Sequence, residues 1–286
     1  MRNNTPDPYE YAQEILSRYL DHFLRERKDV CRQKGIEPLH RMRVASRRLR
    51  AALRVFREIL PSGKVKKWRH QVRLIGRLLG QARQLDIQIR FLEKTRGAEA
   101  RAMVRLLRKD RTVIQKQIVH ELAEHRMKRR FCGLKRGIED LHENHNKSAI
   151  AEFNKNRRRL IIKRVNTIRS FRQYVNRPEC VRELHLLRIA AKNLRYTLEI
   201  LLPWYGVKVD RLIRASRDIQ DVLGDLHELD VLLEFLSAAE RSHTAVYLEG
   251  KYTALRERTY RDFVRLWDLT PLAKATPPKI TALSPN

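Results

Sequence analysis

The sequence predicts an all-α protein made of two similar helical bundles. Three observations predict this architecture: glycine and proline are scarce, with ten of each among 286 residues, apolar residues recur at helical spacing, and one basic motif occurs twice. Because scarce glycine and proline leave few positions for tight turns, long helices with short connections are expected instead of many short strands.

Helical periodicity covers most of the chain and is interrupted at a few residues. Gly35, Pro61 and Gly80 are expected to end the first three helices. Helices are expected at about residues 8–32, 38–60, 64–79, 82–96, 98–128, 149–175, 180–202, 208–223, 225–240 and 243–268.

One motif occurs twice, about half a chain apart. The segment LHRMRVASRRLR at 39–50 aligns with LHLLRIAAKNLR at 184–195, so that His40 matches His185 at an offset of 145 residues. Downstream, a Leu-Gly pair followed by Asp86 aligns with a Leu-Gly pair followed by Asp230, at an offset of 144. Two copies in the same order predict two bundles of the same build.

The repeat also predicts the domain limits. The first domain is expected at residues 8–145 and the second at 146–268, since the segment around 144–148 is polar. Residues 269–286 contain four prolines and are expected to form a disordered tail. For Asp86 and Asp230, helix capping or pairing with a basic neighbour is expected rather than catalysis.

A basic stripe on the second expected helix points to a ligand. His40, Arg43, Arg47, Arg50 and Arg54 are spaced by 3, 4, 3 and 4 residues, which places them within about 80° of one helical face and along roughly 21 Å. These five residues, the N-terminal stripe, include no acid, although like charges one turn apart destabilise a helix. A counter-charge from outside the chain explains such a row best, and phosphate oxygens suit the planar fork of arginine.

The second copy of the motif repeats the arrangement. His185, Arg188, Lys192 and Arg195 form the C-terminal stripe, while Glu199 replaces the fifth cation and is expected to shorten the stripe or to hold a neighbouring arginine. A single basic helix face is usually only solvated, but two matching faces favour a ligand site. The third expected helix adds a basic row, with Arg214 as a counterpart in the second copy: Lys66, Arg69, Arg73 and Arg77.

Composition restricts the partners and the compartment. The formal net charge of +29 implies an anionic partner, and the charge is uneven, because residues 1–180 hold 46 Lys and Arg against 19 Asp and Glu, while residues 181–286 hold 16 against 14. Three cysteines without a CxxC pair indicate neither a disulfide framework nor a zinc site. No apolar run has the length of a membrane span or a signal peptide, so a cytoplasmic location and no membrane partner are expected.

The two His-x-x-Arg-x-x-x-(Arg/Lys)-x-x-Arg helices, each followed by Leu-Gly and a downstream Asp, resemble the CHAD family, the conserved histidine α-helical domain. The resemblance covers about residues 8–268. It implies two antiparallel bundles around a central basic cavity that binds inorganic polyphosphate, with ligand contacts at the first four residues of each stripe. The Glu-x-Glu-x-Lys signature of the CYTH triphosphatase domain, which often precedes this family, is absent. A stand-alone binding protein is therefore expected, with polyphosphate-handling enzymes or granules as further partners.

Two other functions would use the same charge. A nucleic-acid-binding protein is the alternative function, and composition alone does not exclude it. Base stacking needs aromatic side chains between the cations, and neither stripe holds any, so weak, non-specific nucleic-acid binding is the form expected. An enzyme acting on phosphoanhydrides needs clustered carboxylates to hold metal ions, and the stripes contain none, so no catalytic residue, metal site or cofactor is expected. The runs Lys128-Arg129-Arg130 and Arg157-Arg158-Arg159 are expected to be solvated faces.

Overall fold

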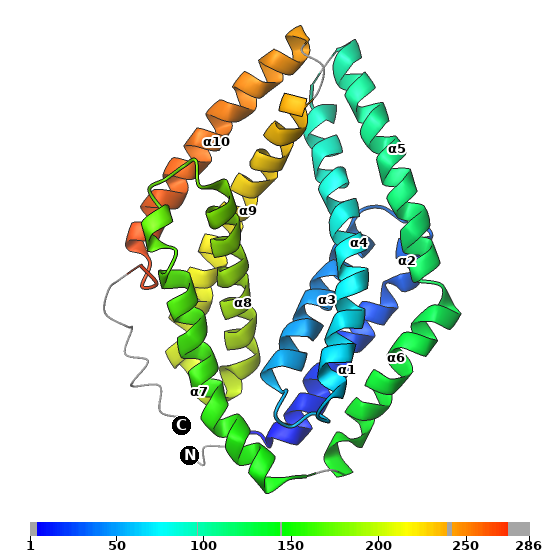
Figure 1. Cartoon of the computed structure of the whole chain (residues 1–286), viewed down its shortest axis with the longest axis vertical. Coiled ribbons are helices and arrows are strands. Elements are labelled where there is room, and N and C mark those ends of the chain that lie inside the picture. Colours follow the sequence, from blue (N-terminus) through cyan, green and yellow to red (C-terminus); the bar gives the residue numbers. More distant parts are fainter. Residues whose placement is uncertain (1–4, 96, 144, 239–241, 274–286) are drawn as a thin grey trace. The chain divides into compact units, whose positions relative to one another are not determined.

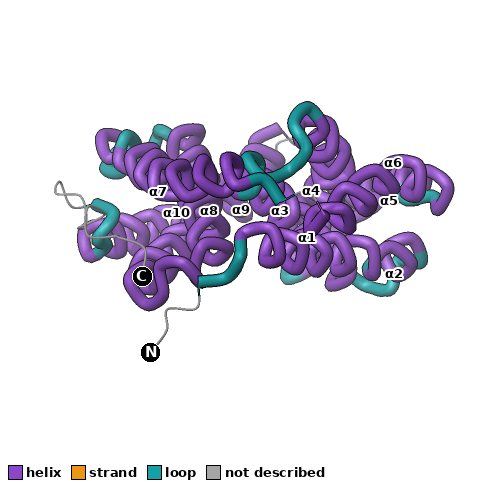
Figure 2. The backbone as a smooth tube through the Cα atoms, turned by 90° about the horizontal axis from the view of Figure 1, so that it is seen from below, coloured by secondary structure: helices purple, strands orange, loops and turns teal. Residues whose placement is uncertain are grey.

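The computed structural model describes residues 5–95, 97–143, 145–238 and 242–273, and these residues form helices joined by loops, without a strand (Figure 1, Figure 2). The all-α prediction is confirmed. The helices are α1 (Pro8–Arg25), α2 (Arg27–Cys31), α3 (Glu37–Val55), α4 (Lys64–Glu93), α5 (Ala98–Glu121), α6 (Glu124–Glu139), α7 (Lys147–Arg169), α8 (Val181–Tyr205), α9 (Asp210–Ala238) and α10 (His243–Leu269).

Two compact units divide the chain. Among the described residues, the N-terminal unit contains 6–95, 101–143 and 145–155, and the C-terminal unit contains 97–100, 156–238 and 242–273 together with residue 5. This division falls inside α7, whereas the sequence places a boundary at 145–146, and the domain limits stay a prediction. The expected disordered tail begins too early, because α10 includes Leu269 and both Thr270 and Leu272 are buried. The rest of that tail, residues 274–286, lies outside the described residues.

In the N-terminal unit, α3 packs against both α1 and α4. Helix α1 begins where the Asp7 carboxylate accepts hydrogen bonds from two backbone N–H groups of the first turn. On α3, the apolar side chains of Met42, Leu49 and Leu53 are completely buried. Because these residues hold one face of α3 in the core, the N-terminal stripe on the other face stays within reach of solvent.

In the C-terminal unit, α9 packs against both α8 and α10. Helix α8 buries Leu187 and Leu194 and continues through Pro203 to Tyr205, beyond the expected end at residue 202. Proline lacks the N–H that an interior helical position would donate. The last turn nevertheless persists because the large side chains of Trp204 and Tyr205 are buried in the core.

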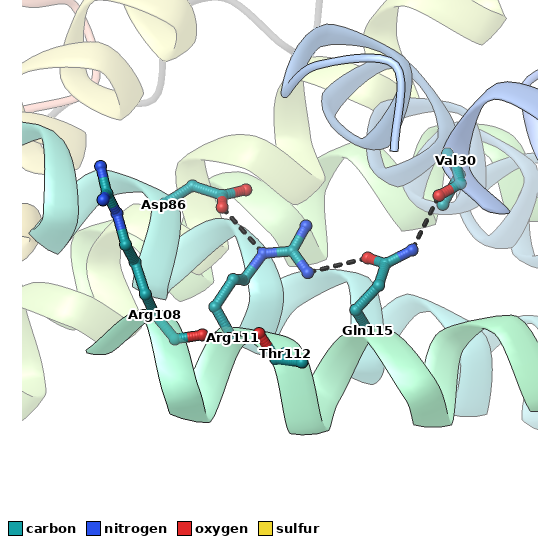
Figure 3. A network of polar contacts seen from close by, with 6 residues as sticks. All are labelled: Val30, Asp86, Arg108, Arg111, Thr112 and Gln115. Atoms are coloured by element: carbon teal, nitrogen blue, oxygen red, sulfur yellow. Dashed lines mark hydrogen bonds and ion pairs between the residues drawn. The ribbon is translucent and has the colours of Figure 1, made fainter. Parts of the chain in front are cut away.

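Two polar contacts brace the N-terminal unit (Figure 3). Arg111 Nε on α5 donates a hydrogen bond to Asp86 Oδ1 on α4 at 2.8 Å. One turn further along α5, Gln115 is buried and its Nε2 donates to the Val30 carbonyl at 2.9 Å. These contacts fix α5 against α4 and against the end of α2.

The same two contacts recur in the C-terminal unit. Arg256 of α10 donates to Asp230 of α9, and the Tyr260 hydroxyl donates to the Val175 carbonyl at 2.7 Å. Each of these four residues lies 144 or 145 positions after its counterpart in the N-terminal unit, which supports the internal duplication. The predicted pairing of Asp86 and Asp230 with basic neighbours is confirmed.

Several predicted helix ends are wrong. Gly80 and Gly224 lie inside the continuous helices α4 and α9, because an interior glycine costs only about 1 kcal/mol relative to alanine and helix packing offsets this. A Cβ at Gly224 would lie 3.6 Å from Arg188 Nε, an ordinary van der Waals distance, so α9 passes close to a stripe arginine at this position. The expected helices 8–32 and 98–128 are instead interrupted, at Glu26 and near Ala123.

Gly137 of α6 provides room for the buried indole ring of Trp68 on α4. A Cβ added at Gly137 would lie 2.5 Å from a ring carbon, whereas one added at Gly133 would lie 4.0 Å from the indole nitrogen. We predict that Gly137→Ala lowers the free energy of unfolding by about 1–3 kcal/mol through overpacking, while Gly133→Ala leaves it unchanged or raises it by up to about 1 kcal/mol. Chemical denaturation measures both, and equal stability of the two variants would contradict this packing.

Candidate functional site

The N-terminal stripe lies along α3 as predicted, and all five of its side chains are half-buried. His40 lies close enough to three arginines for their charges to act on it, so the stripe is a cluster in space and not merely a periodic pattern. Half-burial restricts the guanidinium groups to few orientations and removes part of their hydration, which costs free energy.

His40 is a neutral imidazole near pH 7. Burial lowers its pKa below the usual 6.5, and the positive charges of Arg83, Arg43 and Arg47 lower it further, while Glu37 opposes the shift. The buried Nδ1 of His40 has no hydrogen-bond partner among the described residues. A buried polar atom without a hydrogen bond costs free energy unless an ordered water or a bound group reaches it.

The sequence analysis missed Arg83 as a site residue. Arg83 is half-buried on α4, its charge acts on His40, and its Nη1 is buried without a hydrogen-bond partner among the described residues. The signal that could have found it is the repeat: at the offset of 144 its counterpart is His227, another basic side chain.

The basic row on α4 divides into one half-buried and three exposed members. Arg69 is half-buried, and its pKa is lowered by burial and by the charges of Arg73 and Arg57. Lys66, Arg73 and Arg77 are exposed to solvent. The structure therefore distinguishes Arg69 from the other three, whose role in binding stays a prediction.

The C-terminal stripe lies along α8, where His185, Arg188, Lys192 and Arg195 are half-buried. Burial and the charges of Arg188 and Lys192 lower the pKa of His185 to about 4, so this imidazole is neutral near pH 7. Its ring lies against that of His227 on α9, with 4.0 Å between the ring centroids. The buried Nδ1 of His185 has no hydrogen-bond partner among the described residues. His227 is thus a second residue of this candidate site that the sequence analysis missed.

Acidic groups accompany the C-terminal stripe. Glu199 Oε1 lies 3.7 Å from Arg195 Nη1, which confirms the expectation that this acid holds a neighbouring arginine. Partial burial and the charge of Asp221 raise the pKa of Asp225, and the Arg188 guanidinium opposes that rise. Arg214, the expected counterpart of the α4 row, is exposed.

The two basic runs outside the stripes differ from one another. The prediction for Arg157 is wrong: its side chain is buried, with the guanidinium carbon 5.6 Å from the Trp204 ring centroid and 5.7 Å from that of Tyr205. Burial lowers the pKa of Arg157. Arg158 and Arg159 are exposed, as expected. In the other run, residues 128 and 129 are exposed and Arg130 is half-buried in an ion pair with Glu121.

Two further properties concern the described residues as a whole. They contain no group of three or more His, Cys, Asp or Glu side chains placed to hold a metal ion. Within the same ranges, no helix combines the length and the apolar character that a membrane crossing requires.

Comparison with known proteins places this geometry in a family. The crystal structure of the CHAD domain from the plant Ricinus communis matches with a TM-score of 0.66 and 21% identity, over 97% of this chain and 93% of that one. PptA from Streptomyces chartreusis matches with a TM-score of 0.59 and 15% identity, over 91% and 99%. No curated protein matches the sequence. The family model of the CHAD domain matches residues 14–237, most of the chain, and the protein therefore belongs to the CHAD domain family.

Proposed function

We propose that this protein binds inorganic polyphosphate on the N-terminal and C-terminal stripes without converting it chemically. The observation that carries the proposal is the half-burial of both stripes on α3 and α8, each headed by a neutral histidine with an unsatisfied buried nitrogen. Membership of the CHAD family, whose members are linked to polyphosphate, supports this role.

Each stripe places positively charged side chains about one turn apart along a helix, where they can contact successive phosphates of one chain. A polyphosphate chain carries a negative charge on every phosphate, and each arginine of a stripe can donate two parallel hydrogen bonds to phosphate oxygens. Binding releases the counterions condensed on the polyanion, so affinity falls steeply as the salt concentration rises. The histidines donate to phosphate oxygens at the end of each stripe.

The N-terminal stripe contributes more to binding than the C-terminal stripe. At the repeat offsets, the positions of Glu199 and Asp225 are occupied in the N-terminal unit by Arg54 and Gln81. The acids reduce the positive potential around α8, whereas α3 keeps a fifth cation in the corresponding place.

Binding without catalysis is the simpler account of these side chains. Metal-dependent phosphoryl transfer requires clustered carboxylates to hold the ions, and the stripes themselves contain only cationic and imidazole groups. Phosphate release from polyphosphate by the pure protein with magnesium or manganese, lost in His40→Ala, would replace this account with an enzymatic one.

Three double variants test the stripes. They are matched, because each removes two positive charges four residues apart on one helix. We predict that Arg43→Gln with Arg47→Gln weakens long-chain polyphosphate binding by at least about tenfold, since each charge-assisted hydrogen bond is worth roughly 1.5–3 kcal/mol. Arg188→Gln with Lys192→Gln weakens it less. Arg101→Gln with Arg105→Gln, which changes two exposed residues of α5, weakens it by less than about threefold.

Isothermal titration calorimetry at physiological salt measures the three affinities. Equal losses in the stripe and control variants would show that binding depends on net charge alone. Competition with duplex DNA at equal charge separates polyphosphate binding from nucleic-acid binding, and displacement of polyphosphate by DNA would favour the latter.

The histidines predict a pH dependence. Phosphate oxygens beside an imidazole stabilise its protonated form, so binding raises the lowered pKa values of His40 and His185. The complex then holds more protons than the free protein, and affinity rises as the pH falls from neutrality toward the free pKa, about 4 for His185. Calorimetry near pH 6 in buffers of different ionisation enthalpy should show proton uptake that disappears in the double variant His40→Gln, His185→Gln. Proton release, or an unchanged uptake in that variant, would contradict the assignment.

A further inference from the structure

A pocket of about 440 Å³ lies between α1 and α3 in the N-terminal unit. Its volume is within the roughly 300–1,000 Å³ that small-molecule sites occupy. Three arginines, Arg25, Arg41 and Arg48, line the pocket together with a single acid, Glu26, so its charged side chains are predominantly positive. None of these three arginines belongs to the N-terminal stripe.

The single acid of the pocket is already engaged. Arg41 donates two hydrogen bonds to the Glu26 carboxylate, from Nε to Oε1 and from Nη2 to Oε2, both at 2.9 Å. This bidentate pair fixes one arginine and neutralises its charge. With three arginines against one glutamate, the formal charge of the pocket lining is positive, which favours an anionic occupant.

The pocket also holds neutral hydrogen-bonding and apolar groups. His40, whose imidazole is neutral near pH 7, lines it. Tyr19, Val44 and Ala45 line the pocket with apolar surface. Apolar surface beside a few polar groups is characteristic of sites that bind small molecules.

The cations of this pocket do not take part in the repeat. At the offset of 145, the residues corresponding to Arg25, Arg41 and Arg48 are Ser170, Leu186 and Asn193, which carry no charge. If these arginines served the same polyphosphate surface in both units, cations would be expected at the equivalent positions of the C-terminal unit. The three arginines thus distinguish the N-terminal unit by a feature that the stripes do not explain.

We propose that this pocket binds a short di- or triphosphate group, beside the longer chain held by the N-terminal stripe. The inference rests on the proposed function at one point only: His40 belongs both to the N-terminal stripe and to the lining of this pocket. The group could come from two sources, the end of a polyphosphate chain or a nucleoside triphosphate, and both present the same terminal phosphates to Arg25 and Arg48.

Titration calorimetry with inorganic tripolyphosphate, ATP and long-chain polyphosphate, without divalent metal, tests the proposal on the full chain. The wild-type protein should bind one tripolyphosphate in the pocket, and Arg25→Gln with Arg48→Gln should weaken that binding by at least about tenfold. The control Arg101→Gln with Arg105→Gln should change it by less than about threefold. Val44→Glu, which places a negative charge in the pocket wall, should give the same loss by an independent change.

The stripe variants separate this proposal from the proposed function. Arg43→Gln with Arg47→Gln should weaken long-chain binding while leaving tripolyphosphate binding within about threefold of the wild-type value. ATP binding as tight as tripolyphosphate, and lost in the pocket variants, identifies a nucleoside triphosphate as the source. Much weaker ATP binding identifies the chain end. The proposal is overturned if tripolyphosphate does not bind, or if its affinity falls in the stripe variant and not in the pocket variants. Circular dichroism confirms that each variant keeps its helicity.

Discussion

The half-burial of like-charged side chains along one face of α3 and one face of α8 is the constraint on which the rest of the structure depends. Taking guanidinium groups partly out of water and placing them beside one another destabilises the free protein. The lowered pKa values of His40 and His185 record the same effect, since both are caused by burial together with neighbouring positive charge. The proposed function requires a bound polyanion to remove that repulsion.

The surrounding packing holds these cations in place. Completely buried apolar residues anchor the opposite face of each stripe helix, Leu49 on α3 and Leu194 on α8. Aspartate–arginine pairs then fix α4 to α5 and α9 to α10, again at equivalent positions of the repeat. Helix α9 lies close to the stripe arginine Arg188 at Gly224. The packed helices thus hold these like charges close together despite their mutual repulsion.

The features that the sequence predicts well are those repeated within it. Helical periodicity placed His40 and its arginines on one face of a helix, and the second copy of the motif showed that the pattern was not accidental. The ion pairs of Asp86 and Asp230 were foreseeable for the same reason. Glu199 was also interpreted correctly, because its arginine partner lies four residues away on the same helix.

The features that the sequence analysis missed depend on contacts between distant segments. Arg83 and His227 were overlooked because each joins its site from the neighbouring helix, and Gly80 suggested a helix end where α4 continues. Arg157 lies in a run of three arginines, and its burial depends on aromatic residues almost fifty positions later in the chain. The pocket between α1 and α3 likewise combines residues from two helices whose register no local pattern specifies.

A structure determined with polyphosphate of defined length bound to the protein tests the central claim most directly. Phosphate oxygens within hydrogen-bonding distance of His40 and the arginines of the N-terminal stripe, and of their counterparts on α8, are the predicted result. Phosphates bound instead to exposed basic runs such as Arg158-Arg159, with both stripes unoccupied, would contradict it.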